Sequence, residues 1–405
     1  MAHSKRVAVA AAVTAATSFV AAQSGVYTVS DASTTRTYTV TQDTGGDIPL
    51  ASKHFQYPNL PYHADSGDGP RGTQQGYNLC NSTTLGPDSW CQTGFVNSID
   101  DFCLWGAPMP NVTVGEDEEQ LVAYCTTDKW GTRVIPPGAL QGVQFIKTPD
   151  YVEVVGYVDQ TKLNLQANDY GGEEDPHGAD QRGNPLGALL YSTAFGGSGN
   201  SSSNTPTQVI EWSYFVGSGV FCFKACDPAG DRAAELCEHR YDRVGCTYNA
   251  PADYASINGT FSSCQGEDQL PVGQYISGGR TITWEQPPES LGEITTIPFT
   301  PSIPATSQCS TYSSDQLYTN MASYYSSNGG DATTSAASSG ATSAASSGAR
   351  SGAAAAGSSA VSGARNVNAN AAASSSSTTG AAGKNVAAAG GLALAALLGA
   401  VAFLA

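Results

Sequence analysis

Basic residues are scarce in this chain of 405 residues, which holds 18 Lys and Arg against 35 Asp and Glu and has a formal net charge of -17 at pH 7. A protein that binds nucleic acid needs a basic face for the phosphates. The composition therefore argues against nucleic acid as a partner. An acidic surface by itself indicates only solubility and repulsion of anionic partners.

Motifs of the common catalytic centres are absent as well. The sequence has no Gly-x-Ser-x-Gly nucleophile elbow, no His-Glu-x-x-His zinc motif and no glycine loop for phosphates. Asp43-Thr-Gly45 and Asp65-Ser-Gly67 resemble the two motifs of pepsin-like proteases. Each of those motifs lies in a lobe of its own, and the short segment between these two cannot form a lobe. We expect two polar turns and identify no catalytic signature.

Both ends of the chain carry patterns typical of export. Residues 1–22 have a basic start, an apolar stretch and small residues before Gln23, which predicts a secretory signal peptide. Residues 381–405 have a polar spacer and then an apolar run without a basic flank, which is typical of an attachment signal for a glycosylphosphatidylinositol (GPI) anchor that is removed. We expect an extracellular protein at the cell surface, GPI-anchored to the plasma membrane or transferred to the cell wall.

The ten cysteines form two groups of even number, separated by a long cysteine-free stretch. In an oxidising compartment an even count predicts disulfides rather than metal ligands, although the pairing cannot be deduced. Either group could close on itself, and pairing across the groups is equally allowed. The groups are Cys80, Cys91, Cys103 and Cys125, and then Cys222, Cys226, Cys237, Cys246, Cys264 and Cys309.

Four Asn-x-Ser/Thr acceptors predict N-linked glycans, which require exposed positions in a secreted chain. The acceptors are Asn81, Asn111, Asn200 and Asn258.

Composition divides the predicted mature chain into three zones. Residues 23–76 are rich in Ser, Thr and Gly, and residues 77–327 hold all the cysteines. Residues 328–380 consist almost entirely of Ser, Ala, Gly and Thr, with too little apolar bulk to offset the entropy of ordering the chain. We expect a disordered stalk between the cysteine-bearing body and the anchor signal.

The cysteine-bearing body is predicted to be all-β or β-rich, because its apolar runs are β-branched and aromatic and are bounded by turn residues. Such strands favour a disulfide-braced, β-sandwich-like ectodomain. One or two short helices are predicted, over 231–240 and 314–325. The strand predictions are 151–158, 208–215, 220–224 and 280–284.

Polar side chains are densest in the glycine-rich segment 169–180. Hard oxygen ligands there could hold calcium, or a carboxylate pair could act on a sugar, with His177 as a base. The segment matches no known cation loop, so a solvated connector is the alternative. No other cofactor and no metal ligand set is indicated. The candidate ligand residues are Asp169, Glu173, Glu174, Asp175, His177 and Asp180.

Four segments of the body, between Cys80 and Cys309, resemble the secreted fungal proteins called macrophage activating glycoproteins. They are residues 101–110, 142–151, 169–180 and 221–242. The resemblance implies a secreted or surface fungal glycoprotein. It carries no catalytic residue with it, because no reaction is assigned to that family.

We expect a fungal cell-surface glycoprotein that acts in display, adhesion or binding of cell-wall or host glycans. Two alternatives remain open at this stage. One is an extracellular glycan-active hydrolase that uses acids of the 169–180 loop, and the other is a structural cell-wall glycoprotein.

Overall fold

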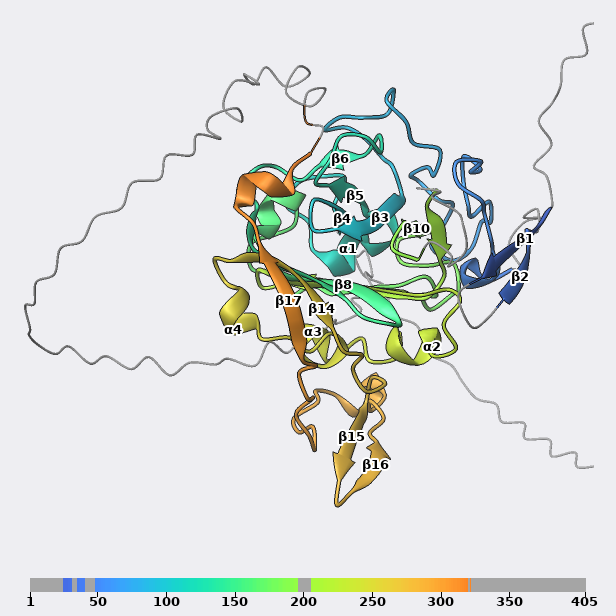
Figure 1. The fold of residues 1–405 in the computed structure, drawn as a ribbon. Coiled ribbons are helices and arrows are strands. Elements are labelled where there is room, and N and C mark those ends of the chain that lie inside the picture. The colour runs from blue at the N-terminus through green and yellow to red at the C-terminus, as the bar shows by residue number, and fades with distance from the viewer. Residues whose placement is uncertain (1–24, 31–34, 41–47, 196–204, 320, 322–405) are drawn as a thin grey trace, which may run out of the picture. The chain divides into compact units, whose positions relative to one another are not determined.

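A computed structural model describes residues 25–30, 35–40, 48–195, 205–319 and 321. The chain is rich in strands and has only short helices, which confirms the predicted β-rich class (Figure 1). The predicted signal peptide, the stalk, the anchor signal and the acceptor Asn200 lie outside the described residues. Within the part of the chain that the structure describes, no helix has both the length and the apolar character needed to cross a membrane.

One sheet has six strands in the order β11-β10-β3-β4-β5-β6. The pairs β10–β3 and β5–β6 are parallel, and the other neighbours are antiparallel. The strands are β3 (Thr93–Ser98), β4 (Asp101–Gly106), β5 (Val122–Cys125), β6 (Arg133–Val134), β10 (Leu189–Ser192) and β11 (Thr207–Val209).

The second sheet has seven strands in the order β17-β14-β7-β8-β13-β12-β9. Only β14 and β7 run parallel to each other among its neighbours. The strands are β7 (Leu140–Lys147), β8 (Tyr151–Val158), β9 (Gly172–Glu174), β12 (Trp212–Gly217), β13 (Val220–Cys226), β14 (Phe261–Gly266) and β17 (Thr306–Thr311).

The main hydrophobic core lies between these two sheets. Side chains alternate along β8, so that Val152 and Val154 join the same buried cluster as Leu104 of β4 and Val122 of β5. Phe55, from the segment before the first sheet, belongs to this cluster as well. The two sheets therefore form a sandwich, as the sequence predicted.

The other face of the seven-stranded sheet is covered by short helices. Val155 packs with Ile257 and its neighbours, and Tyr151 packs with Leu236. Figure 1 shows α2, α3 and α4 on the side of this sheet away from β3, β4 and β5. The central strands β8 and β13 of this sheet are therefore buried on both faces. The helices are α2 (Ala233–Leu236), α3 (Gly245–Asn249) and α4 (Tyr254–Ile257).

The remaining elements are short. A hairpin joins β15 (Gln274–Ser277) to β16 (Arg280–Thr283), and another joins β1 (Gly25–Ser30) to β2 (Thr35–Val40). Helix α1 (Val114–Asp117) begins with a capping box between Thr113 and Glu116. Single 3-10 turns occur at Leu50–Ser52, Glu118–Gln120, Gln160–Leu163, Glu289–Leu291 and Ser314–Leu317.

All ten cysteines are paired in five disulfides. Each bond stays inside one of the two groups recognised in the sequence, and two of the bonds begin on β13 and tie that strand to the helical layer. The pairs are Cys80–Cys91, Cys103–Cys125, Cys222–Cys246, Cys226–Cys237 and Cys264–Cys309.

The helix predictions were too long. Only Ala233–Leu236 of the segment 231–240 is α-helical. The segment 314–325 begins as a 3-10 turn, and Thr319 then donates its backbone N–H to the carbonyl of Thr126, while residues 320 and 322–325 lie outside the described residues. That long-range bond draws the chain into an extended bridge next to the first sheet, so the apolar spacing alone did not decide the local structure.

Candidate functional site

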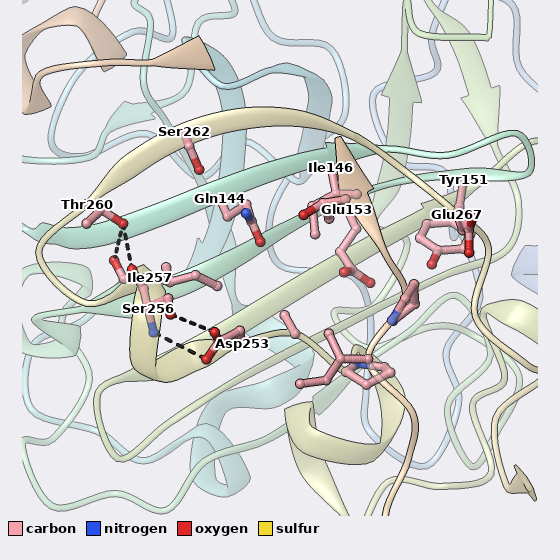
Figure 2. Close-up of a pocket in the computed structure, with 15 residues that line it drawn as sticks. Gln144, Ile146, Tyr151, Glu153, Asp253, Ser256, Ile257, Thr260, Ser262 and Glu267 are labelled. Atoms are coloured by element: carbon pink, nitrogen blue, oxygen red, sulfur yellow. Dashed lines mark hydrogen bonds between the residues drawn. The ribbon is translucent and has the colours of Figure 1, made fainter. Parts of the chain in front are cut away.

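A pocket of about 210 Å³ lies on the helix-covered face of the seven-stranded sheet. Its floor is made by side chains of β7, β8, β14 and β17, and its rim by residues 251–257 and 303–304 (Figure 2). A concave site with convergent polar groups and perturbed titratable residues is the default candidate for ligand binding.

A buried ion pair lies beneath the pocket, and of its two members only Glu153 lines the pocket. Glu153 of β8 and Lys224 of β13 are cross-strand partners, and the Nζ atom of Lys224 lies 3.6 Å from Oε2 of Glu153. Glu153 is 2% exposed and Lys224 is 1% exposed. The Oε2 atom of Glu153 accepts no hydrogen bond from any described residue. Because this oxygen is enclosed, the ammonium of Lys224 compensates its charge.

Lys224 is fully engaged beneath the pocket. Its ammonium group donates to the backbone carbonyl of Asn249 and to Oε1 of Gln269, and it lies 5.0 Å from the centroid of the Tyr151 ring. Burial lowers the pKa of Lys224 to about 8, although the charge of Glu153 acts to raise it. Burial likewise raises the pKa of Glu153, against the opposing effect of Lys224.

The rim mixes polar and apolar side chains, because Asp253 and Ser256 stand beside the exposed Ile303. Asp253 caps α4, and its carboxylate accepts hydrogen bonds from the backbone N–H and from the hydroxyl of Ser256. Glu267 stands at the end of β14 and also lines the pocket (Figure 2). Of the described residues that line the pocket, none is Lys, Arg or His. The pocket is therefore acidic, with Gln144 and several hydroxyl groups as further hydrogen-bonding groups.

The 169–180 loop predicted as a ligand site lies elsewhere. Its strand β9 is at one edge of the seven-stranded sheet, whereas the pocket spans the strands from β17 to β8 at the other end. The structure therefore does not bring the predicted residues and the pocket together. A role for the loop in ligand binding stays a prediction.

Two of the loop's acids make structural contacts. The carboxylate of Asp169 accepts from the backbone N–H groups of Val114 and Gly171. Asp180 forms an ion pair with Arg71, whose Nη2 atom lies 2.5 Å from Oδ1. These bonds hold the loop to neighbouring segments.

Glu173 and Glu174 are buried in the edge strand, and none of their carboxylate oxygens accepts a hydrogen bond from a described residue. They pair with Phe215 and Tyr214 of β12, so they point to opposite faces of the sheet. Burial and the surrounding acids raise the pKa of both carboxyls well above the usual range.

His177 and Asp175 form a small polar cluster on the loop. Asp175 accepts from the backbone N–H groups of His177 and Gly178, and burial raises its pKa. Nε2 of His177 lies 3.1 Å from Oε2 of Glu211, and its ring stacks on His239 at 3.8 Å between centroids. Burial lowers the pKa of His177, but the hydrogen bond and charge of Glu211 outweigh burial, so the pKa is raised.

Among the residues that the structure describes, no three His, Cys, Asp or Glu side chains are arranged to hold a metal ion. In the Asp65-Ser-Gly67 segment, the carboxylate of Asp65 accepts from the backbone N–H of Gly67 and from the guanidinium of Arg182. Asp43 lies outside the described residues.

Sequence reasoning missed the pocket, although two signals were present. Glu153 is the one charged residue in the apolar run 151–158, and Lys224 is the one charged residue in β13. A lone charge in a strand buried on both faces requires a partner, and opposite charges in two neighbouring strands indicate a pair. The rim residues gave no comparable signal.

No protein-family model and no solved structure matches the chain. Two curated relatives come from Mycosarcoma maydis. Appressorium protein ROW1 is 46% identical over 253 residues, which is 62% of this chain and 55% of the relative. Appressorium protein ROW2 is 40% identical over 230 residues, which is 56% of this chain and 74% of the relative. The chain thus spans about half the length of ROW1, and it belongs to the family of fungal appressorium proteins represented by ROW1 and ROW2.

Proposed function

We propose that this chain is an extracellular fungal glycoprotein, GPI-anchored at the cell surface, which binds a glycan in the pocket on the helix-covered face of its sandwich. The observation that supports the binding role is the pocket of about 210 Å³ itself, whose lining includes the amide of Gln144, the hydroxyl of Ser262 and the carboxylate of Asp253. Sugar hydroxyls donate and accept hydrogen bonds and so complement such a lining.

The surface location rests on separate support. Five disulfides are typical of an oxidising, extracytoplasmic compartment. The acceptors Asn81, Asn111 and Asn258 are all exposed, which N-glycosylation requires. The names of the two fungal relatives fit a protein of the cell surface, and the resemblance to macrophage activating glycoproteins points to the same location.

The hydrolase alternative has weaker support. Glu173 and Glu174 are buried within the edge strand, and Asp169 and Asp180 are engaged in structural hydrogen bonds. A general acid and a nucleophile must instead reach the glycosidic bond. Replacement of Asp175 or His177 by Ala should abolish turnover of a glycan if the alternative holds, and should leave surface display unchanged if it does not.

The proposal is tested on intact cells. Treatment with phosphatidylinositol-specific phospholipase should release the protein, and the released material should bind selected glycans on an array. Release by glucanase alone would instead indicate a wall-linked structural protein. Release by phospholipase without any glycan binding would overturn the binding role and retain the anchor.

A further inference from the structure

A surface groove of about 350 Å³ lies against the loop that the disulfide Cys80–Cys91 closes. It is lined by Tyr62, by Tyr77 and by residues 83–89 of that loop. We call it the Tyr62 groove. It shares no lining residue with the pocket on the helix-covered face of the sandwich, so it is a separate site.

Two stacked aromatic rings stand in this groove. The ring centroids of Tyr62 and Tyr77 are 5.5 Å apart, and the planes are inclined by 26°. Tyr77 is half-buried, whereas Tyr62 is 59% exposed. The face of an aromatic ring is electrostatically negative, and the C–H groups of a sugar ring are weakly positive, so a sugar ring can stack on an exposed tyrosine.

Both tyrosines are held in place before any ligand arrives. The backbone N–H of Asn78 donates to the carbonyl of Tyr62 at 2.7 Å, and Tyr77 forms a parallel bridge with Cys91. The hydroxyl of Tyr77 accepts from the backbone N–H of Trp90 at 3.2 Å. A contact made with a preorganised surface costs less conformational entropy than one made with a flexible surface.

The glycan acceptor Asn81 stands at the start of the same loop. It is exposed, and its Oδ1 atom accepts from the backbone N–H of Thr83 at 2.8 Å and from the hydroxyl of Thr83 at 2.7 Å. Thr83 itself lines the Tyr62 groove, so the side chain of Asn81 lies at the edge of the groove. Both bonds use the amide oxygen and leave the amide nitrogen for the linkage to a sugar.

The rest of the lining suits the first sugar of an N-linked glycan, which is N-acetylglucosamine. Leu85 and Pro87 present apolar surface to the acetyl methyl group, and the exposed carboxylate of Asp88 can accept from a ring hydroxyl. Resting on the proposal that the chain is a glycoprotein, we infer that the glycan at Asn81 folds back into the Tyr62 groove, with its first sugar stacked on Tyr62. The carbohydrate is then part of the folded structure and stabilises it.

Occupancy of the acceptor is measured first, by mass spectrometry of glycopeptides from the full-length protein released from cells. Asn81 should carry a glycan. A bare Asn81 beside glycosylated Asn111 and Asn258 would overturn the inference and leave the glycoprotein proposal standing, whereas three bare acceptors would overturn both. Glycan binding on the array tests the pocket separately, because the groove residues do not line it.

A thermodynamic cycle then tests the contact. Asn81→Asp removes the glycan and keeps an acceptor oxygen for Thr83. Its effect on the melting temperature is compared in the wild type, in Tyr62→Ala and in Tyr170→Ala. Tyr170 is the matched control, because it is 64% exposed and does not line the groove.

Asn81→Asp should lower the melting temperature by about 2–4 °C in the wild type and in Tyr170→Ala, and by less than half as much in Tyr62→Ala. The difference between wild type and Asn81→Asp should survive an endoglycosidase that trims every glycan to its first sugar. Equal lowering in all three backgrounds, or no lowering in the wild type, would overturn the inference. Loss of the difference on trimming would overturn the assignment of the contact to the first sugar.

Discussion

Glu153 and Lys224 are neighbours across two central strands of the seven-stranded sheet, both are buried, and Oε2 lies 3.6 Å from Nζ. Removal of one member leaves the other as an uncompensated buried charge. We expect Glu153→Leu to lower the free energy of unfolding by about 3–5 kcal/mol, and the double variant Glu153→Leu/Lys224→Leu to cost less than that single change. Urea unfolding measures both, and a double variant less stable than Glu153→Leu would contradict the pairing.

Arg182 holds Asp65 through two hydrogen bonds of 3.1 Å from Nε and Nη2, and its Nη2 atom also donates to the carbonyl of Gly67. Lys cannot reproduce this planar geometry, so Arg182→Lys should cost about 2 kcal/mol of stability. The control is Arg240→Lys, because the side chain of Arg240 is 75% exposed and solvent screens its ion pair with Glu238. That change should cost less than about 0.5 kcal/mol. Equal losses would show that the burial of the Asp65 pair contributes nothing.

The contribution of His177 to stability should depend on pH. Burial lowers the pKa of His177, but Glu211 outweighs burial, so the pKa is raised in the folded protein. Asp175 and Glu238 raise the pKa by smaller amounts, and the ring of His239 stacks on that of His177. A histidine whose pKa is raised by folding stabilises the fold at pH values below its ordinary pKa, and this contribution disappears as the pH rises through the raised pKa. His177→Gln should therefore lower the melting temperature more near about pH 5 than near about pH 8.

The control for this experiment is Glu211→Gln, which removes the main source of the shift. It should flatten the pH dependence of the wild-type stability in the same range. A loss of stability in His177→Gln that is the same at both pH values would show that the ring acts only through packing.

Asp117 should destabilise the protein at neutral pH. Burial and the charges of Glu119 and Glu116 raise its pKa to about 6, and its Oδ2 atom has no hydrogen-bond donor among the described residues. A carboxyl group whose pKa is raised by folding stabilises the fold at pH values below its ordinary pKa. For Asp117 this stabilisation is lost as the pH rises through about 6. Asp117→Asn should therefore gain about 1 kcal/mol at neutral pH, a figure discounted because the carboxylate is only half buried.

Thermal unfolding of Asp117→Asn at two pH values checks this prediction. The gain should vanish below about pH 4, where the wild-type carboxyl is protonated in both states. A variant that is equally stabilised at both pH values would instead indicate a change in local conformation.

The sequence predicted those strands whose position is decided by a local run of β-branched and aromatic residues. The run 151–158 coincides with β8, and 220–224 falls inside β13. The run 208–215 is divided between β11 and β12, which belong to different sheets. That division depends on long-range pairing, which the local alternation of residues does not encode.

The candidate site could not be predicted in the same way. The pocket is assembled from residues 144–153, 251–267 and 303–306, which become neighbours only when the strands pair. The 169–180 loop was chosen for its density of charge, but β9 pairs with β12 and buries two of its acids, while Arg71 binds Asp180 from a distant segment. Charge density in a sequence does not reveal which groups will be enclosed.

One exposed side chain near the pocket has a practical consequence for work with this protein. Asn258 follows directly after Ile257, which lines the pocket, and its acceptor motif ends at Thr260, which lines it too. A carbohydrate attached at Asn258 would stand at the pocket entrance and compete with an incoming ligand for space. Material from bacteria and material from a fungal host would then give different affinities, and the glycoform would have to be fixed before any two measurements are compared.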